Sequence, residues 1–529
     1  MFDVAIVGYG PVGKLLAILL AQRGHKVAAI DRFASVYALP RAVHFDDETG
    51  RLLDQAGVGD AVRKICITRN APAEFLSGSG DVLLRLQAEA PPNAGWPARN
   101  FFHQPELEQI LADRAASLPG LSFFGGYEAG RPVQDDAGVT LSLRKLDPAD
   151  GADEGADEGE RVIRAKYLVG CDGANSLVRE SIGAPVEDLG CTHDWLVVDF
   201  RRDGSQAWPQ AGRQYCDPAR PTTYVPLGPH AFRMEFMLKA GEGRDDFGTA
   251  AAVLAMVARA GLPTQGIEIV RQAIYTFRAL WLTRWQSGRI FIAGDAAHLT
   301  PPFLGQGLCS GMRDAATLAW KIDLVLAGHA HADVLETYGR EREPHVATLI
   351  RCAMDYGAVI CVTDPEQASK RDSQMLVDGV KTLPAVPRPR LGPGIALADD
   401  PHAGYLLPQG RVEHDGAIQS VDQIQRGGFL LLGADADPLA NLSEQSRRFL
   451  RGIGTQALNV TSSRDVDGVF GPWLARQERR FALVRPDYYV FGTAAHAADV
   501  EPMVAALRRQ LAASAAASDA PAVARAAAF

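Results

Sequence analysis

The sequence predicts an α/β fold, and three observations support this. Residues 3–7, 26–30 and 289–293 are short apolar runs rich in β-branched residues, typical of buried parallel strands. The first run leads through a glycine-rich turn into a helical stretch and the second run. Residues 185–280 alternate apolar and polar side chains between turn signals, which predicts an antiparallel sheet. With 529 residues, 47% of them hydrophobic, the chain has core enough for about three domains.

Residues 3–31 have the full context of a dinucleotide-binding motif, namely strand, G-x-G-x-x-G turn, helix, strand and terminal acid. Gly8 permits the tight turn, Gly10 lets a pyrophosphate approach the backbone, and Gly13 lets the helix pack on the strand. The helix N-terminus presents its positive dipole end to the phosphates. The candidate binding residues here are Gly8, Gly10, Pro11, Val12, Gly13, Asp31 and Arg32. The motif predicts a Rossmann-type domain and leaves NAD and FAD both open.

Two later motifs favour FAD. Asp172-Gly173 follows a predicted strand, and Gly294-Asp295 follows another. A carboxylate at a strand end can bind a ribitol hydroxyl, and glycines at a helix start free N–H groups for the N1–C2=O edge of a reduced flavin. Each motif alone is typical of a plain turn. The candidate residues here are Asp172, Gly294, Asp295, Pro302, Gly305, Gly307 and Leu308, the last four preceding or opening a predicted helix to about residue 326.

Together and in this order, the three motifs resemble the class A flavoprotein aromatic hydroxylases with the p-hydroxybenzoate hydroxylase fold. The resemblance covers about residues 1–395 and implies bound FAD, with Asp172, Gly173 and Arg179 linked to both FAD and NAD(P)H. The family more often has Glu where Asp31 stands, which preserves the carboxylate. The segments 40–42 and 102–107 resemble flavin-side segments of the family, so Arg41 and Gln104 are predicted cofactor contacts; a surface arginine and a helix-capping glutamine are the alternatives.

Several stretches look closest to the 3-(3-hydroxyphenyl)propionate hydroxylases, among them 40–49, 305–315 and 484–490. This resemblance implies an NAD(P)H-consuming monooxygenase that hydroxylates a phenolic, carboxylated ring with O₂ through a C4a-hydroperoxyflavin. The chain has one good G-x-G-x-x-G motif, so NAD(P)H is expected as a transient co-substrate. The resemblance implies NADH, although the residues alone do not decide between NADH and NADPH.

Three residues are candidates for the substrate site. His44 lies in the predicted flavin-side segment, and a histidine can take a phenol proton near neutral pH, so it is the catalytic candidate. Arg220 is the candidate for a substrate carboxylate and Tyr224 for a substrate hydroxyl. The alternatives are a capping or structural histidine, and a solvated strand face for the other two. No metal site is expected.

The remaining chain divides into a linker, a domain and a tail. Pro and Gly are dense over 383–401, which marks a linker after a 1–395 core with its substrate sheet over 185–280. Residues 400–510 have a βαβ-like succession with a final hairpin and resemble the thioredoxin-like domain of the phenol-hydroxylase branch. No cysteine follows Cys361, so this domain lacks a redox dithiol and is expected to be structural. The acidic segment 147–160 is predicted to be a hairpin loop, and 511–529 an Ala-rich frayed tail.

The composition of the chain argues against several classes of binding partner. A net charge of −9 without a basic stripe argues against nucleic acid. No run of 18 apolar residues occurs, so no membrane span is expected. Seven cysteines without a C-x-x-C pair fit a reducing cytoplasm. A homodimer is left open.

Three rival functions stay open. A flavin hydroxylase or epoxidase of polycyclic or heterocyclic metabolites would share every cofactor motif. A flavin-binding sensor and a plain NAD-dependent dehydrogenase are the rivals from other classes.

Overall fold

The structure is a computed structural model that describes residues 1–37, 41–68, 71–87, 95–146, 161–228, 230–384 and 387–512. Pro40, the predicted acidic loop 147–160 and residues 513–529 of the predicted tail lie outside the described residues. The chain divides into two compact units. The first contains Met1–Ala316 and Arg342–Arg390, and the second contains Thr317–Glu341 and Leu391–Phe529.

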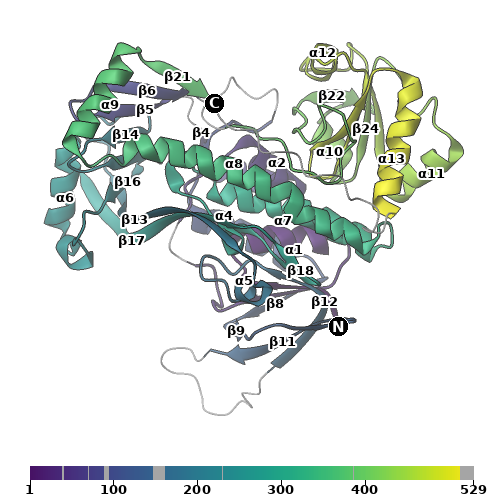
Figure 1. Cartoon of the computed structure of the whole chain (residues 1–529), viewed down its shortest axis with the longest axis horizontal. Coiled ribbons are helices and arrows are strands. Elements are labelled where there is room, and N and C mark those ends of the chain that lie inside the picture. The colour runs from purple at the N-terminus through teal and green to yellow at the C-terminus, as the bar shows by residue number, and fades with distance from the viewer. Residues whose placement is uncertain are drawn as a thin grey trace. The chain divides into compact units, whose positions relative to one another are not determined.

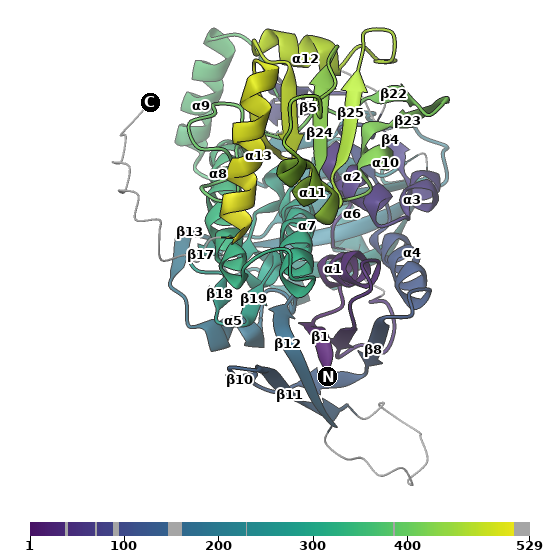
Figure 2. The ribbon, with the colours of Figure 1, turned by 90° about the vertical axis from the view of Figure 1, so that its right-hand side faces the viewer.

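The first unit contains the predicted parallel sheet, in which β2 (Val27–Asp31), β1 (Phe2–Val7), β12 (Arg161–Gly170) and β19 (Ile290–Ile292) are neighbours in this order. Helix α1 (Pro11–Ala21) connects β1 to β2, as a parallel pair requires a crossover connection (Figure 2). The sheet and its helices also contain β8 (Leu121–Gly125), β9 (Tyr127–Ala129), β10 (Val133–Asp135), β11 (Gly138–Lys145), β18 (Gln286–Ser287), α1 (Pro11–Ala21), α4 (Gln104–Ala116) and α5 (Leu177–Ile182).

Further strands and helices complete the first unit; of the two longest helices given below, α7 belongs to this unit up to Ala316 and α8 from Arg342. Three short strands form a separate sheet in the order β3-β7-β4. Asp46 caps α2 by accepting a hydrogen bond from the Thr49 backbone. The elements are β3 (His44–Phe45), β7 (Asn100–Phe101), β4 (Ile67–Thr68), α2 (Asp47–Gln55), α3 (Gly59–Ile65), η2 (Gly294–Ala296), η3 (Pro302–Leu304), α7 (Gly307–Leu326), α8 (Thr337–Ile360) and α9 (Pro365–Val377).

A second, nine-stranded sheet contains the predicted antiparallel region. The long strands β13 (Val186–Arg202) and β17 (Ile267–Leu282) pair with each other, and β13 also pairs with β16 (Ala231–Met237) (Figure 1). The order is β20-β17-β13-β16-β15-β14-β5-β6-β21. The other members and the attached helices are β20 (His298–Leu299), β15 (Thr222–Pro226), β14 (Arg213–Cys216), β5 (Ala73–Ser77), β6 (Val82–Gln87), β21 (Lys381–Pro384), η1 (Arg244–Phe247) and α6 (Ala250–Arg259).

Alternation along the strands gives this sheet two distinct faces. Residues 196, 198, 232, 234 and 236 pack into one hydrophobic cluster with Val253 and Val257 of α6. The intervening residues, including Trp195, Asp199, Arg233 and Glu235, therefore lie on the opposite face, which we call the inner face.

The second unit is built on a four-stranded sheet in the order β25-β24-β26-β27. Strands β24 and β25 are parallel, whereas β26 runs antiparallel to both of its neighbours. The elements are β22 (Arg411–His414), β23 (Ala417–Ser420), α10 (Val421–Gln425), β24 (Leu430–Ala434), α11 (Glu444–Gly452), β25 (Gln456–Val460), α12 (Phe470–Arg476), β26 (Phe481–Val484), β27 (Val490–Ala494), η5 (Ala497–Asp499), α13 (Val500–Ala512) and, earlier in the chain, η4 (Ala332–Glu336).

The second unit also includes Thr317–Glu341, which the predicted boundary near residue 395 assigned to the core. Buried charges explain the difference. Arg485 bonds Glu341 at 2.8 Å and Asp487 at 2.7 Å, and Lys321 bonds Glu341 at 3.0 Å. Trp320 donates its indole N–H to Asp487. Such pairing between residues distant in sequence is invisible in the linker composition from which the boundary was predicted.

Within the described residues, no single helix is long and apolar enough to cross a membrane; one pair, Ala332–Ile360 with Pro365–Val377, passes on length and composition but is bent by 107°.

Candidate functional site

The three predicted cofactor motifs meet at one edge of the parallel sheet. Strands β1, β12 and β19 are parallel neighbours, so their carboxyl ends lie side by side. The Cys171 N–H donates to the Val7 carbonyl at 2.7 Å, and the Ala293 N–H donates to the Gly170 carbonyl at 2.9 Å. The glycine turn, the Asp-Gly turn and the Gly-Asp turn all begin directly after these bonds. This edge is where open α/β sheets bind ligands.

The glycines of the first turn have separable roles. Gly8 has a φ of +95°, and a Cβ there would lie 2.3 Å from the Cys171 carbonyl oxygen. A Cβ at Gly13 would lie 2.1 Å from the Gly8 carbonyl oxygen. A Cβ at Gly10, in contrast, meets no described heavy atom within 4 Å. The fold therefore requires glycine at 8 and 13, whereas the space in front of Gly10 fits the close approach of a cofactor phosphate.

Two alanine substitutions should separate these roles. Gly13→Ala is expected to lower the free energy of unfolding by about 3 kcal/mol or more. The added Cβ would overlap the Gly8 carbonyl oxygen, a backbone atom that cannot rotate away as a side chain can. Gly10→Ala should leave the unfolding midpoint of the apoprotein unchanged and reduce FAD affinity, because its Cβ occupies space left for the pyrophosphate. Thermal unfolding and FAD titration of the apoprotein check both. Equal FAD affinity in Gly10→Ala and wild type would contradict the phosphate role.

Asp31 and its neighbours complete this turn. The Asp31 carboxylate accepts hydrogen bonds from the Tyr9 backbone at 2.6 Å and the Phe33 backbone at 2.9 Å. Each carboxylate oxygen keeps a lone pair for a further donor. The side chain thus positions the turn and can still accept from a ribose. Arg32, also predicted to contact the cofactor, is exposed, and Pro11 and Val12 open α1.

The Asp-Gly and Gly-Asp motifs are joined by Arg179. Asp172 accepts from the Ser176 hydroxyl at 2.5 Å and the Val178 N–H at 3.1 Å, and burial raises the pKa of its carboxyl. Arg179 then donates to the Asp295 carbonyl at 3.4 Å. The Arg179 N–H also donates to the Ser176 hydroxyl at 2.9 Å, so Ser176 and Arg179 link the Asp172 turn to the Asp295 turn.

The Asp295 carboxyl group is an acceptor in need of a donor. Burial raises its pKa, while the charges of His298, Arg41 and Arg179 act in the opposite direction. Among the described residues no hydrogen bond reaches this carboxylate. The side chain is half-buried and its carboxylate keeps its acceptor sites, so this position fits a hydroxyl-bearing cofactor.

The start of α7 contributes the last predicted segment. Gly305 ends η3 with a φ of +65°, Gly307 opens α7 with no neighbour within 4 Å of an added Cβ, and Leu308 follows it. Pro302 begins the preceding turn. The open space before Gly307 again suits a ligand at a helix N-terminus.

Two consecutive residues of α7 fix these turns, and sequence reasoning missed both. Asp314 accepts from the Gly294 N–H at 3.1 Å, from His298 at 2.7 Å and from Arg342 at 2.8 Å. Arg313 bonds Asp46, Glu48 at 2.6 Å and Gln306 at 3.1 Å. The available signal was a pair of consecutive charged residues in a mostly apolar helix, although their partners could not be read from it.

Connected hydrogen bonds and an ion pair from α1 and α4 hold the segment that begins at Arg41. The Gln104 side chain accepts from the Arg41 and Ala42 backbones, each at 2.7 Å, and donates to Glu108 at 2.8 Å. Lys14 pairs with Glu108 at 2.8 Å, and both side chains are buried. Gln104 thus positions the predicted flavin-side segment, and Lys14 is a further positioning residue that the sequence analysis missed. Its charge inside the apolar helix α1 was the available signal.

His44 lies beside the glycine loop. It pairs with Phe101 through β3 and β7, and a Cβ on Gly305 would lie 3.1 Å from its Nδ1. Its Nε2 is buried and has no hydrogen-bond partner among the described residues. Burial and the Arg99 guanidinium lower the pKa of His44 to about 4. The imidazole is therefore neutral near pH 7 and can accept a hydrogen bond at that nitrogen.

The other two substrate candidates lie elsewhere. Tyr224 is fully buried in the hydrophobic cluster below α6, and its hydroxyl donates to the Pro209 carbonyl at 3.1 Å. It therefore lies on the face of the sheet opposite to Arg233. Arg220 forms a two-pronged ion pair with Glu242, at 2.5 and 2.7 Å, and also donates to the Met237 carbonyl. Neither location fits the predicted substrate contact. Strand alternation directs Tyr224 into the hydrophobic cluster, and Arg220 is paired with Glu242, a residue distant in sequence.

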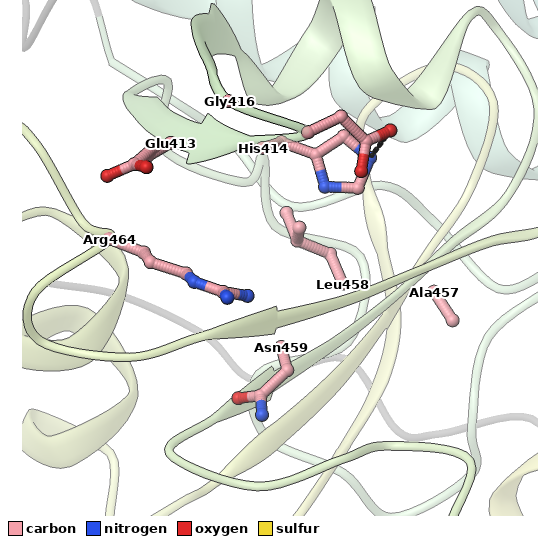
Figure 3. Close-up of a pocket in the computed structure, with 8 residues that line it drawn as sticks. Glu413, His414, Gly416, Ala457, Leu458, Asn459 and Arg464 are labelled. Atoms are coloured by element: carbon pink, nitrogen blue, oxygen red, sulfur yellow. Dashed lines mark ion pairs between the residues drawn. The ribbon is translucent and has the colours of Figure 1, made fainter.

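Two surface pockets have linings that include none of the predicted site residues, although the first is lined by Glu242, the partner of Arg220. One of about 770 Å³ is lined by β13 and the segment around Glu242 in the first unit. The other, of about 340 Å³, lies in the second unit between the β22–β23 hairpin and the edge strand β25, with Glu413, His414 and Arg464 around its mouth (Figure 3). None of the predicted site residues lines either pocket within the described chain. The seven cysteines are free, and Cys309 is buried, which raises the pKa of its thiol to about 12.

The described residues fit FAD. Three strand ends converge, Gly10 and Gly307 face open space, and the carboxylate of Asp295 lacks a donor. The FAD binding domain family matches residues 1–353. The chain belongs to this family. A second family, the HcaD C-terminal domain, matches residues 404–510 of this flavoprotein.

Several proteins are similar over nearly the full length. A protein of Rhodococcus jostii (strain RHA1) named "Probable NADH-specific resorcinol 4-hydroxylase" is 36% identical over 508 residues, covering 94% of this chain and 93% of that protein. A 3-(3-hydroxy-phenyl)propionate/3-hydroxycinnamic acid hydroxylase of Burkholderia vietnamiensis (strain G4 / LMG 22486) is 32% identical, covering 92% and 93%. The crystal structure of aklavinone-11 hydroxylase with FAD and aklavinone matches with a TM-score of 0.79 and 26% identity, covering 96% and 99%. The flavoprotein is an FAD-dependent monooxygenase of the aromatic hydroxylase type.

Proposed function

We propose that this flavoprotein hydroxylates a phenolic ring, with NADH as the transient electron donor and O₂ as the oxidant. The observation that carries the proposal is the convergence of the three cofactor motifs at one sheet edge, next to the inner face of an antiparallel sheet. The relatives named as hydroxylases of resorcinol and of hydroxyphenylpropionate support a phenolic substrate. FAD, when bound, supplies the activation of O₂.

The chain's own residues bind and orient the reactants. Gly10, Gly307 and Asp295 are proposed to hold the cofactor's phosphates, ring edge and ribityl chain, with Asp31, Asp172 and Arg41 around them. Lys14, Glu108 and Gln104 keep the segment at residues 41–44 in place, so His44 meets the substrate in a fixed geometry. His44 Nε2 is proposed to accept the phenol proton or its hydrogen bond.

Product formation tests the function directly. The purified holoenzyme, given NADH and a panel of phenols, should consume NADH faster with a substrate and release a hydroxylated product in equal amount. A polycyclic phenol in the same panel tests the rival function that the likeness to aklavinone-11 hydroxylase suggests. NADH oxidation that yields peroxide alone with every phenol would overturn the proposal.

His44→Gln should separate the proton role from a structural one. Product formation is expected to fall about 100-fold, the lower end of the range for a general base, while FAD content is unchanged. The unfolded chain binds a proton below about pH 6.5, whereas folded His44 does so near pH 4. Wild type should therefore lose stability relative to His44→Gln as the pH falls from about 6.5 to about 4. Identical pH profiles and coupling in both proteins would contradict the assignment.

We propose further that residues 400–510 form a thioredoxin-like domain with a structural role. The order β25-β24-β26-β27, with one parallel pair followed by an antiparallel hairpin, supports this. No cysteine follows Cys361, so the domain lacks a dithiol. The free cysteines support a reducing compartment such as the cytoplasm, and a homodimer stays a prediction.

A further inference from the structure

Five side chains form one row across the inner face of the nine-stranded sheet. The strand registers pair Ala273 with Val197, Val197 with Glu235, Glu235 with Thr223, and Thr223 with Gln214. Residues directly opposite each other in antiparallel strands share a face. We call these five residues the central row. It combines two apolar side chains with a carboxyl, a hydroxyl and an amide group.

The rows on either side are covered by segments proposed to bind the flavin. Trp195 and Met237 lie two residues from Val197 and Glu235 along their strands. The Trp195 ring packs edge-on against the Phe303 ring of η3, with the ring centroids 6.0 Å apart, and Met237 belongs to the same hydrophobic cluster. Two residues toward the other end, Arg233 donates to the Arg41 carbonyl at 2.6 Å. Two residues of a strand span about 7 Å. Along the strands, the central row therefore lies between the contact with η3 and the contact with the residue 41 segment.

Glu235 is the charged member of this row. It is 8% exposed, and no hydrogen bond reaches its carboxyl group from the described residues. The neighbouring Thr223 hydroxyl instead donates to Gln214 at 2.6 Å. Burial raises the pKa of Glu235, with Arg233 acting against this rise. A buried acceptor without a donor costs free energy, which indicates a partner that arrives with the ligand.

Two arginines near the row are already paired with one carboxylate. Asp199 accepts from Arg233 at 2.7 and 3.0 Å and from Arg271 at 3.1 Å. Arg233 also bonds the Arg41 carbonyl. The central row itself contains no lysine, arginine or histidine. A substrate carboxylate in this row would face the Glu235 carboxyl group, and the row itself offers no cation to offset the repulsion.

We propose that Glu235 accepts a hydrogen bond from a phenol hydroxyl of the substrate, and that the central row selects a neutral hydroxylated ring, such as a dihydroxybenzene, over a phenolic acid. This rests on the proposed function and names its substrate class. It replaces the expectation of a carboxylated ring, whose candidate cation Arg220 is occupied by Glu242.

Ligand binding to the oxidised holoenzyme tests this without turnover. Resorcinol and 3-(3-hydroxyphenyl)propionate are titrated separately, and the change in flavin absorbance gives each Kd. Wild type should bind resorcinol more tightly. Glu235→Gln should weaken resorcinol binding about tenfold, because a charge-assisted hydrogen bond is replaced by a neutral one, and should leave or improve binding of the acid. The matched control Glu268→Gln changes an exposed glutamate of β17 and should alter neither Kd.

FAD content and unfolding midpoint, measured for all three proteins, report on the fold. An equal loss for both ligands in Glu235→Gln, or a loss of resorcinol binding below threefold, would overturn the role of Glu235. Tighter binding of the acid by wild type would overturn the substrate class whether or not the variant folds. Wild type that hydroxylates the acid but not resorcinol rejects this inference alone, whereas wild type that hydroxylates no phenol rejects the proposed function as well.

Discussion

Replacing Asp314 by alanine is expected to lower the free energy of unfolding of the first unit by about 3–5 kcal/mol and to yield protein without FAD. Asp314 is fully buried and accepts from Gly294, His298 and Arg342. Its removal leaves the buried Arg342 guanidinium without its carboxylate, and an unpaired buried charge is far more costly than a lost neutral hydrogen bond. The Gly294-Asp295 turn also loses the bond that fixes its backbone, so the cofactor site opens.

Two further variants show whether the loss of stability comes from the buried charge of Asp314. Asp314→Asn keeps an acceptor oxygen but loses the charge and should lie between wild type and Asp314→Ala. Asp355→Ala removes an exposed aspartate of α8 and should change stability by less than about 0.5 kcal/mol. Chemical unfolding and the flavin absorbance of the purified proteins give both quantities. If Asp314→Ala retains FAD and wild-type stability, the network does not support the cofactor turn.

Arg485→Met is expected to destabilise the second unit by about 3–5 kcal/mol. The Arg485 side chain is buried with those of Lys321, Glu341 and Asp487, giving two cations and two carboxylates. Without Arg485, the two carboxylates share one ammonium group, whose pKa is already lowered to about 8 by burial. The neutral thioether fills similar volume but leaves buried negative charge uncompensated.

Hydrogen exchange of β24 and β26 measures this effect, because a protein with two units need not unfold in one transition. Arg451→Met is the control: Arg451 pairs with Glu444 at the surface, and losing such a pair costs at most about 1 kcal/mol. Equal exchange rates in Arg485→Met and wild type would show that the four charges contribute no net stability. A larger effect in the control would contradict the distinction between buried and exposed pairs.

Local patterns were sufficient to predict the three cofactor motifs and the strands that precede them, because each motif lies within one short segment. The G-x-G-x-x-G turn, Asp172-Gly173 and Gly294-Asp295 each follow their own strand, and parallel pairing of those strands brings them together. Parallel strands at a buried sheet have carboxyl ends at one edge, so sequence order and strand type were sufficient. The family resemblance strengthened this prediction, and the matching FAD binding domain family confirmed the cofactor.

Substrate contacts were harder to predict from the sequence. They depend on which face of a strand each side chain occupies and on partners that are distant in sequence. Tyr224 and Thr223 are adjacent in sequence, yet alternation buries the first below α6 and places the second on the inner face. Arg220 looked available for a carboxylate until the fold brought Glu242 to it. A one-residue shift in the assumed register exchanges the two faces, so composition alone could not choose between them.

The sequence by itself determined the α/β class, the flavin motifs and the absence of a dithiol in the last domain, because these depend on residue type and on spacing within short segments. The tertiary structure alone decided which charges are paired. Lys14 with Glu108, Asp314 with Arg342, and Glu341 with Arg485 join residues that are 94, 28 and 144 positions apart. Such pairs form because burial makes an unpaired charge costly, and which carboxylate meets which cation is set by the packing of the elements that carry them.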